Sequence, residues 1–285
     1  MIAGEETECV EHCEIGLQRY DPKRYGSHRD LYGGHDAGVC AWSLGAQAKW
    51  LLGYPDAALS GQTEGLALAN RISHAPTLIF ALSYSALLHV HRCEPKLILS
   101  RLAAAEAVAA EQRLSVFINP QVLRGMALFM RGEAAEAIRY LRDGLPPGRS
   151  GGVRLLGFCL LAEALARQGD SEEALSIIDE ALKAAETTGE GWFTHELHRV
   201  RGIVLMSQNK VQESEAALCR AIQVARDQRA KSRELRAVTS LARLWGEQGR
   251  RQEARDLLMP IYDWFTEGFD TADLKEAKAL LGELA

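Results

Sequence analysis

The sequence predicts an all-α protein, a solenoid in which antiparallel helix pairs stack one on the next. Two observations lead to this fold class. Apolar residues recur at helical spacing along the whole chain of 285 residues, and the alternation typical of strands is nearly absent. A motif of small residue, break and small residue also returns every 37 to 40 residues. A fixed period of this size is the sequence sign of a repeat architecture.

The chain begins with one amphipathic helix, expected over residues 5–18. Cys9, Cys13 and Leu17 share one face of it, because residues about four positions apart lie on the same side of a helix. We interpret this helix as the second helix of a repeat whose first helix is missing. The face around Val10, Cys13 and Leu17 is then expected to be an open surface or the interface with a partner, including a second copy of the chain.

An irregular segment follows, at residues 19–36, and completes a leading unit over residues 1–38. It is rich in Gly, Pro, Tyr and His, and it gathers titratable side chains, among them His28, Asp30 and His35. A loop of this length is often functional. Two interpretations stay open, a hydrogen-bonded loop that seals a repeat and a site for a ligand or metal.

Six repeats are expected over residues 39–268. The first helix of each ends at a break, and the breaks fall at Gly53, Cys93, Gly132, Gly169, Asn209 and Gly249. Gly and Asn tolerate the left-handed conformation that commonly ends a helix. Seven residues before each break stands a small residue, namely Ala46, Ala86, Gly125, Ala162, Gly202 and Ala242. Small side chains at these positions let the two helices of a repeat approach closely.

Helix starts also follow from the sequence. After Gly169, Asp170 and Ser171 are candidate N-caps, and acidic residues occupy the first turn, where the helix dipole favours them. In residues 269–285, Asp270 or Thr271 is expected to cap a last helix. The outer face of that helix is charged, as the terminal unit of a solenoid requires.

The spacing of small residues and breaks resembles that of tetratricopeptide repeat (TPR) proteins, which implies a right-handed superhelix. Three stretches, Trp50–Leu59, Glu196–Leu205 and Ala242–Leu281, narrow the resemblance further. They are similar to the C-terminal TPR region of bacterial predicted ATPases fused to adenylate/guanylate cyclase or winged-helix DNA-binding domains. The chain departs from those proteins because it has no G-x-x-x-x-G-K-[ST] phosphate-binding motif, and Arg149–Gly152 reads only as a loop. The resemblance therefore supplies no active-site residue.

Composition limits the function. Lys and Arg number 33 against 38 Asp and Glu, giving a net charge of −5, so a strongly basic nucleic-acid binder is not expected. The basic residues between Arg226 and Arg236 read as a solvated turn. No apolar run approaches the roughly 20 residues that a membrane span needs. The acidic N-terminal segment lacks the features of a secretory signal, and we expect a cytoplasmic protein.

Motifs for catalysis or metal binding are not recognisable. The six cysteines are scattered, and the Cys9–Cys13 pair alone does not make a zinc site. His195 and His198 share a helical face, but no third ligand is placed beside them. We therefore expect no enzyme, no cofactor and no metal.

The concave wall of the superhelix is the expected binding surface. Its N-terminal half is expected to be apolar and its C-terminal half to carry arginines. Apolar grooves with Met and aromatic residues adapt to different partners, and arginine can hold a carboxylate with two hydrogen bonds. The candidate binding residues are Trp50, Leu87, His91, Met126, Phe129, Met130, Arg167, Arg199, Met206 and Arg243.

These features favour a non-catalytic protein-interaction or regulatory module that binds a peptide or partner protein in its groove. The resemblance places it in bacterial signalling or transcriptional regulation. One alternative is a sensor domain that binds a small effector and so changes its self-association. A chain that only oligomerises, for instance through its first helix, is a further alternative.

Overall fold

The computed structural model describes residues 5–25, 34–145 and 152–285, and these residues form helices and no strand. The expected loop residues His28 and Asp30, and Arg149 to Gly151, lie outside this part. The helices are α1 (Glu6–Arg19), α2 (Pro22–Tyr25), α4 (Ala37–Leu52), α5 (Pro55–Ile72), α6 (Ala75–His91), α7 (Pro95–Gln112), α8 (Pro120–Met130), α9 (Ala134–Gly144), α10 (Gly152–Arg167), α11 (Ser171–Thr188), α12 (Thr194–Ser207), α13 (Val211–Asp227), α14 (Lys231–Glu247), α15 (Arg251–Trp264) and α16 (Ala272–Glu283).

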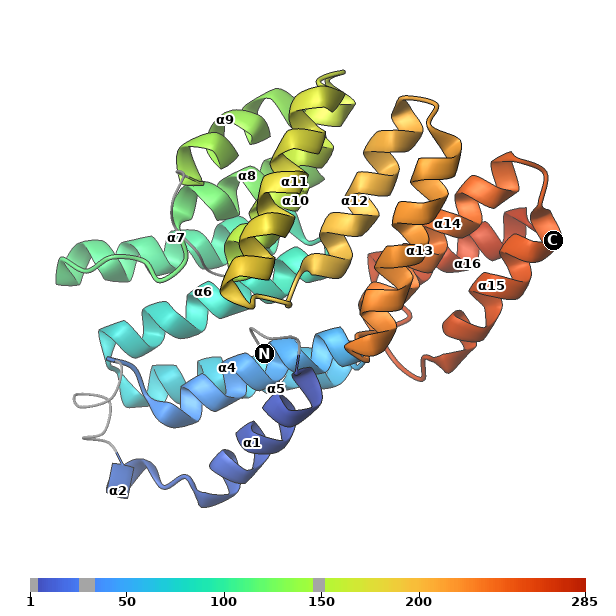
Figure 1. Cartoon of the computed structure of the whole chain (residues 1–285). Coiled ribbons are helices and arrows are strands. Elements are labelled where there is room, and N and C mark those ends of the chain that lie inside the picture. The colour runs from blue at the N-terminus through green and yellow to red at the C-terminus, as the bar shows by residue number, and fades with distance from the viewer. Residues whose placement is uncertain (1–4, 26–33, 146–151) are drawn as a thin grey trace.

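The helices pack as antiparallel pairs in chain order, which confirms the predicted all-α solenoid. The pairs are α4/α5, α6/α7, α8/α9, α10/α11, α12/α13 and α14/α15, with α1 before them and α16 after them. Figure 1 shows the pairs following one another in a curve from blue through green to red. No helix in the described residues is long and apolar enough to cross a lipid bilayer.

The six predicted breaks all have the left-handed backbone conformation. The φ angle is +98° at Gly53 and +58° at both Cys93 and Asn209, and the other three breaks are glycines with φ between +81° and +93°. Proline then stands in the first turn of several helices, as Pro55 does at the start of α5, where its missing N–H costs nothing. The sequence pattern therefore locates the turn inside every repeat.

Helix capping differs from the prediction at two places. Asp170 occupies the N-cap of α11, but its side chain accepts no backbone hydrogen bond there. Thr271 occupies the N-cap of α16, but its hydroxyl donates to the Gly268 carbonyl instead. A carboxylate cap is formed at α4, where Asp36 Oδ1 accepts from the backbone N–H groups of Gly38 and Val39 at 2.9 and 3.1 Å.

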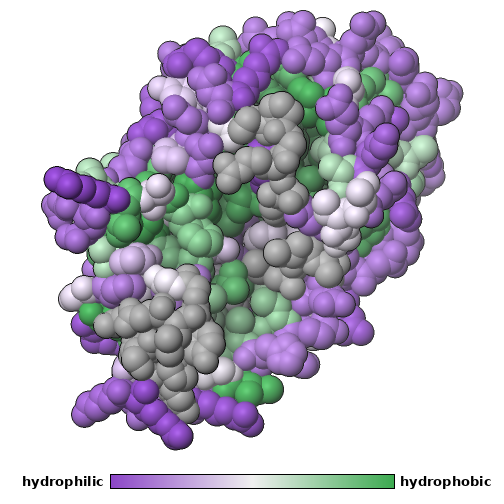
Figure 2. Space-filling model, turned by 60° about the vertical axis from the view of Figure 1, so that its left-hand side comes forward, coloured by the Kyte–Doolittle hydropathy of each residue, from purple (hydrophilic) through white to green (hydrophobic). Residues whose placement is uncertain are grey.

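Apolar side chains between the helix layers form the core in three clusters, a large one from Trp50 to Val204, a second from Leu218 to Leu284 and a smaller one from Val39 to Ala81. Small residues allow the close approach. A Cβ atom on Gly144 of α9 would lie 2.9 Å from the backbone nitrogen of Val122 in α8. On the face drawn in Figure 2, hydrophobic residues gather along the hollowed middle, and hydrophilic residues cover most of the edges.

The first helix does not present the open apolar face that we expected. Cys13 packs against Gly45 of α4, and Glu14 pairs with Lys49 at 2.9 Å. Val10, Cys13 and Leu17 are half-buried in this contact. The reason is that α1 stacks on α4 as the second helix of a preceding repeat would. α4 thus covers the face that we had placed at the surface.

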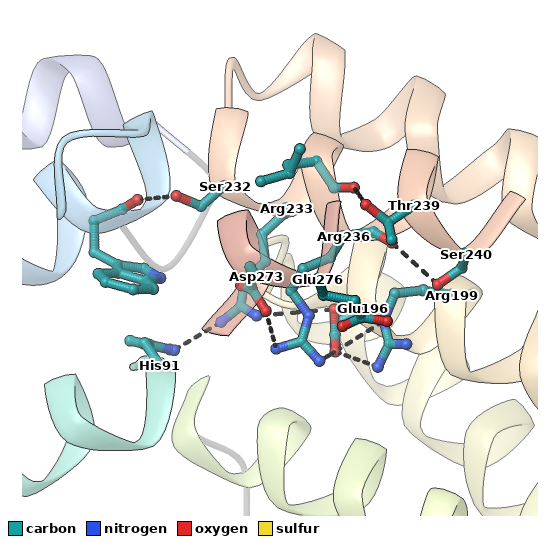
Figure 3. A network of polar contacts seen from close by, with 12 residues as sticks. His91, Glu196, Arg199, Ser232, Arg233, Arg236, Thr239, Ser240, Asp273 and Glu276 are labelled. Atoms are coloured by element: carbon teal, nitrogen blue, oxygen red, sulfur yellow. Dashed lines mark hydrogen bonds and ion pairs between the residues drawn. The ribbon is translucent and has the colours of Figure 1, made fainter. Parts of the chain in front are cut away.

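The superhelix also closes on itself, which the sequence did not indicate. The C-terminal ends of α4 and α6 meet the N-terminal end of α14, and residues 265–271 meet the start of α5. We call this contact the seam. Ser232 donates to the Trp50 carbonyl at 2.6 Å, and Arg233 donates to His91 Nδ1 at 2.7 Å. Figure 3 shows both contacts between the blue, teal and orange segments.

Candidate ligand-binding cavity

A cavity of about 750 Å³ lies on the inner side of the C-terminal repeats. First helices of four successive repeats, α8, α10, α12 and α14, contribute to its lining, and the final helix α16 adds to it. This is the wall on which we expected the binding groove. Its volume falls within the range of ligand-binding pockets, roughly 300–1,000 Å³.

One side of the cavity is apolar. Phe129 and Met130 come from the last turn of α8, Leu160 from α10, and Ile203 and Met206 from α12. The left-handed turn at Gly132 ends α8 shortly after Phe129 and Met130. Met130 and Met206 are half-buried, so part of each side chain is accessible. This side suits an aliphatic or aromatic group of a ligand.

The register of α12 depends on Gly202, which also lines the cavity. A Cβ atom there would lie 2.6 Å from Leu218 Cγ on α13, so only glycine allows this approach. Ser214 of α13 donates to the Gly202 carbonyl at 2.8 Å. These contacts hold α12 with Ile203 and Met206 directed to the cavity.

The rest of the cavity lining includes charged residues, and arginines supply its cations. Arg167 lies over the Phe129 ring at 4.3 Å and pairs with Glu163 at 2.8 Å. Arg243 pairs with Glu276 of α16 at 2.7 Å. Both arginines are about half exposed, at 53% and 44% of the side chain. They form the rim of the cavity and are accessible to a ligand.

A buried charged cluster lies beneath this rim, made of Glu196, Arg199, Arg233, Arg236 and Asp273. Glu196 Oε1 accepts from Arg199 at 2.8 Å and lies 3.2 Å from Arg236, and its Oε2 lies 3.9 Å from Arg233. Arg199 also reaches Glu163 at 3.2 Å, and Arg236 lies 3.8 Å from Asp273. Figure 3 shows Glu196 surrounded by these guanidinium groups.

The cluster sets the charge of its members. Burial would raise the pKa of Glu196, but Arg199, Arg236 and Arg233 hold it well below its usual range. Burial raises the pKa of Asp273, although Arg236 opposes this. Burial and Arg233 lower the pKa of His195 to about 3, so its imidazole is neutral at pH 7. Glu196 is thus a carboxylate held in its ionised form by three arginines.

Six of the predicted site residues line the cavity. They are Phe129, Met130, Arg167, Arg199, Met206 and Arg243. Arg199 is placed differently from the expectation, because it is only 6% exposed and most of its donors go to Glu163 and Glu196.

The other four predicted residues do not line the cavity, which corrects the prediction. Trp50 and His91 are each 2% exposed, because α14 covers them at the seam. Leu87 and Met126 are fully buried in the core. A rotation of one residue around a helix is about 100°, enough to turn a groove position into a core position.

The sequence interpretation missed Glu196, Arg233, Arg236 and Asp273 as members of a site. The sequence did contain a sign of this cluster. Glu196 and Arg199 stand three residues apart on α12, and Arg233 and Arg236 stand three residues apart on α14, the first helix of the next repeat. We had read the latter pair as part of a solvated basic turn. In the structure, both are paired with Glu196, and Glu234 pairs with Arg226 and Lys231, each at 2.7 Å.

Some of the described residues were also candidates for metal ligands. Among the described residues, no group of three or more His, Cys, Asp or Glu side chains could hold a metal ion. His195 is buried beside Phe193, with ring centroids 6.3 Å apart in an edge-to-face arrangement.

Comparison with known proteins supports the fold. No family model matches the chain. The chain is 29% identical over 256 residues to an uncharacterised protein of Rhizobium meliloti (strain 1021), a match that covers 85% of this chain and 24% of that protein. The chain therefore spans about a quarter of the length of the curated relative that it matches.

Solved structures of similar fold include NprR, a Rap protein and a TPR protein. NprR in complex with its cognate peptide NprX has a TM-score of 0.62 at 15% identity, covering 98% of this chain and 82% of that one. A Rap protein complexed with competence and sporulation factor has a TM-score of 0.61 at 12% identity, covering 98% and 80%. A TPR protein from Parabacteroides merdae has a TM-score of 0.54 at 12% identity, covering 98% of both chains. The chain thus has a TPR-type fold.

Proposed function

We propose that this chain is a non-catalytic protein-interaction module that binds a peptide, or an extended segment of a partner protein, in the inner cavity. The observation that carries the proposal is the cavity itself. It combines an apolar side containing Phe129 and two methionines with a rim of half-exposed arginines. A peptide offers both kinds of group, apolar side chains and carboxylates or carbonyls.

The comparisons support this use of the fold. Of the structural neighbours, NprR is in complex with its cognate peptide NprX, and the Rap protein is in complex with competence and sporulation factor. The match to a protein about four times as long supports a module that occurs within larger bacterial proteins. A regulatory role is what the resemblance to ATPase-linked regulators implies. On the basis of that resemblance, we extend the proposal to a role in cytoplasmic signalling or transcriptional regulation.

The experiment selects peptides from a random 12-residue display library against the chain and measures their affinity by fluorescence anisotropy. Met206→Glu and Arg243→Glu each alter the cavity wall without removing a fully buried side chain. We expect each to weaken binding by at least tenfold.

Leu97→Glu is the matched control. It places the same charge on an exposed apolar residue of α7, a second helix that does not line the cavity. We expect this variant to bind as the wild type does. Selected peptides that bind all three variants equally well, with unchanged circular dichroism, would contradict the proposal.

The cavity volume also favours a second candidate, a small effector. A small effector that binds the folded chain raises the melting temperature in proportion to the logarithm of its concentration, with no peptide present. Self-association that changes with effector concentration would then support the sensor alternative over the peptide-binding module.

A further inference from the structure

The seam holds together parts of the chain that are about 140 to 210 residues apart. Glu267 Oε1 accepts from the backbone N–H groups of Asp56 and Ala57 at 2.9 and 3.1 Å, and Asp56 Oδ2 accepts from Gly268 N–H at 3.1 Å. Glu267 thus caps α5, whose own N-cap residue, Tyr54, makes no side-chain cap. We call this reciprocal contact the latch.

The seam combines polar contacts with aromatic packing. Besides the Ser232 and Arg233 contacts, Arg92 donates to Asp270 at 3.2 Å. Trp264 packs against Gly53, and its ring centroid lies 5.8 Å from that of Tyr54. The apolar clusters of the core run mainly between successive repeats, so opening of the seam would leave most of that packing in place.

Several buried polar atoms at the seam have no hydrogen-bond partner among the described residues. They are His91 Nε2, Arg92 Nη1 and Arg233 Nε. A buried polar group left unpaired costs about 1–3 kcal/mol, a cost that hydration removes. Closure of the seam is thus opposed in part by groups that regain water on opening.

The cavity touches this joint from both sides. Cys93 follows Arg92 at the end of the first helix of the second repeat, and it lines the cavity. Arg236, one turn after Arg233 on α14, and Asp273 of α16 line it from the other side. A ligand that contacts both sides binds the closed form more tightly, and it can shift the equilibrium only by that difference in affinity.

We propose that the seam is the joint at which the superhelix opens and closes, that Asp56 and Glu267 are its latch, and that a ligand in the cavity favours the closed form. The ligand half of this inference rests on the proposed function. Opening of the seam does not, and it is measured without any ligand.

The test replaces the latch by Asp56→Ala/Glu267→Ala. The matched control is Glu180→Ala/Glu186→Ala, which removes the same charge from two exposed residues of α11. The joint is observed by fluorine NMR after the tryptophans are labelled with 5-fluorotryptophan. Trp→Phe variants assign each signal. Trp50 and Trp264 lie at the seam, the latter against Gly53, whereas Trp42 and Trp245 lie in other contacts.

In the latch variant, we expect the fluorine signals of Trp50 and Trp264 to shift or split, those of Trp42 and Trp245 to stay in place, and the radius of gyration to rise. Helix content should not change. The control variant should match the wild type. A folded latch variant with wild-type signals and radius of gyration would overturn the inference. If the latch variant does not fold, Ser232→Ala, which removes the donor to the Trp50 carbonyl, serves as a milder opening of the same joint.

A selected 12-residue peptide then tests the coupling. We expect it to return the Trp50 and Trp264 signals of the latch variant toward their wild-type positions, and to bind that variant at least fivefold more weakly than the wild type. Equal affinity for both forms, with no shift of these signals, would overturn the coupling. Failure of any peptide to bind would contradict the proposed function and leave the result on seam opening intact.

Discussion

Removing the charge of Glu196 is expected to destabilise the protein more than any comparable surface change. The perturbation is Glu196→Gln, which keeps the shape of the side chain and one carbonyl acceptor. Glu196 is 2% exposed and lies within 4 Å of guanidinium groups from Arg199, Arg233 and Arg236. Its carboxylate is therefore the central anion among three cations that are largely withdrawn from water.

The magnitude follows from that geometry. Removing one partner of a buried ion pair costs about 3–5 kcal/mol, because the remaining charge stays buried without compensation. Glu163 and Asp273 still lie near Arg199 and Arg236, at 3.2 and 3.8 Å, and compensate part of the charge. We therefore expect a loss of about 3 kcal/mol, the lower end of that range.

Urea unfolding followed by circular dichroism measures this loss as a change in the free energy of unfolding. The matched control is Glu173→Gln, which removes a charge from an exposed pair with Arg142, where side-chain exposures are 47% and 52%. An exposed pair contributes about 0.2–1 kcal/mol. A loss of less than 1 kcal/mol for Glu196→Gln would refute the assignment of Glu196 as the centre of the cluster.

Four other predictions follow from packing and protonation. Gly144→Ala should cost about 1–3 kcal/mol in urea unfolding, because its Cβ would meet the α8 backbone at 2.9 Å, whereas Gly16→Ala, with open space around it, should stabilise slightly. Leu87→Ala should lower the free energy of unfolding by about 2–5 kcal/mol, because Leu87 is in the core. Peptide affinity below the melting temperature should not change. Weakened binding by the folded variant would show that Leu87 belongs to the binding groove. The unfolded chain protonates His195 near pH 6.5 and the folded chain only near pH 3, so this residue lowers stability by about 1.4 kcal/mol per pH unit as pH falls below 6.5. Burial raises the pKa of Glu6 to about 7, so protonation of Glu6 stabilises the folded chain as pH falls below 7. Glu6→Gln lacks this contribution, and its melting temperature should therefore fall more steeply with acid than that of the wild type. An equal slope would contradict this prediction.

The fold could be predicted from the sequence because its determinants are local. Each break residue, such as Gly53 or Asn209, decides the end of its own helix through its backbone conformation. The same period places small residues such as Gly202 at the helix crossings. In a solenoid, each repeat contacts mainly its neighbours, so a local pattern repeated six times specifies most of the architecture.

The candidate site could be predicted only in part, because two of its determinants are not local. Closure of the seam joins residues far apart in sequence, and it buries Trp50 and His91, which a periodic pattern places on an open wall. The charged cluster likewise joins Glu196 to arginines of the next repeat. Their charges had suggested a solvated turn, since sequence composition does not show that opposite charges meet inside the fold.

The most direct test of the account follows the methionine methyl groups by NMR while a selected 12-residue peptide is added. Met130 and Met206 line the cavity, whereas Met259 lies on α15, a second helix outside it. The account predicts that the signals of Met130 and Met206 shift with saturation at the measured affinity and that the signal of Met259 stays in place. Saturating peptide that leaves Met130 and Met206 unchanged, or that shifts Met259 alone, would contradict binding in the cavity.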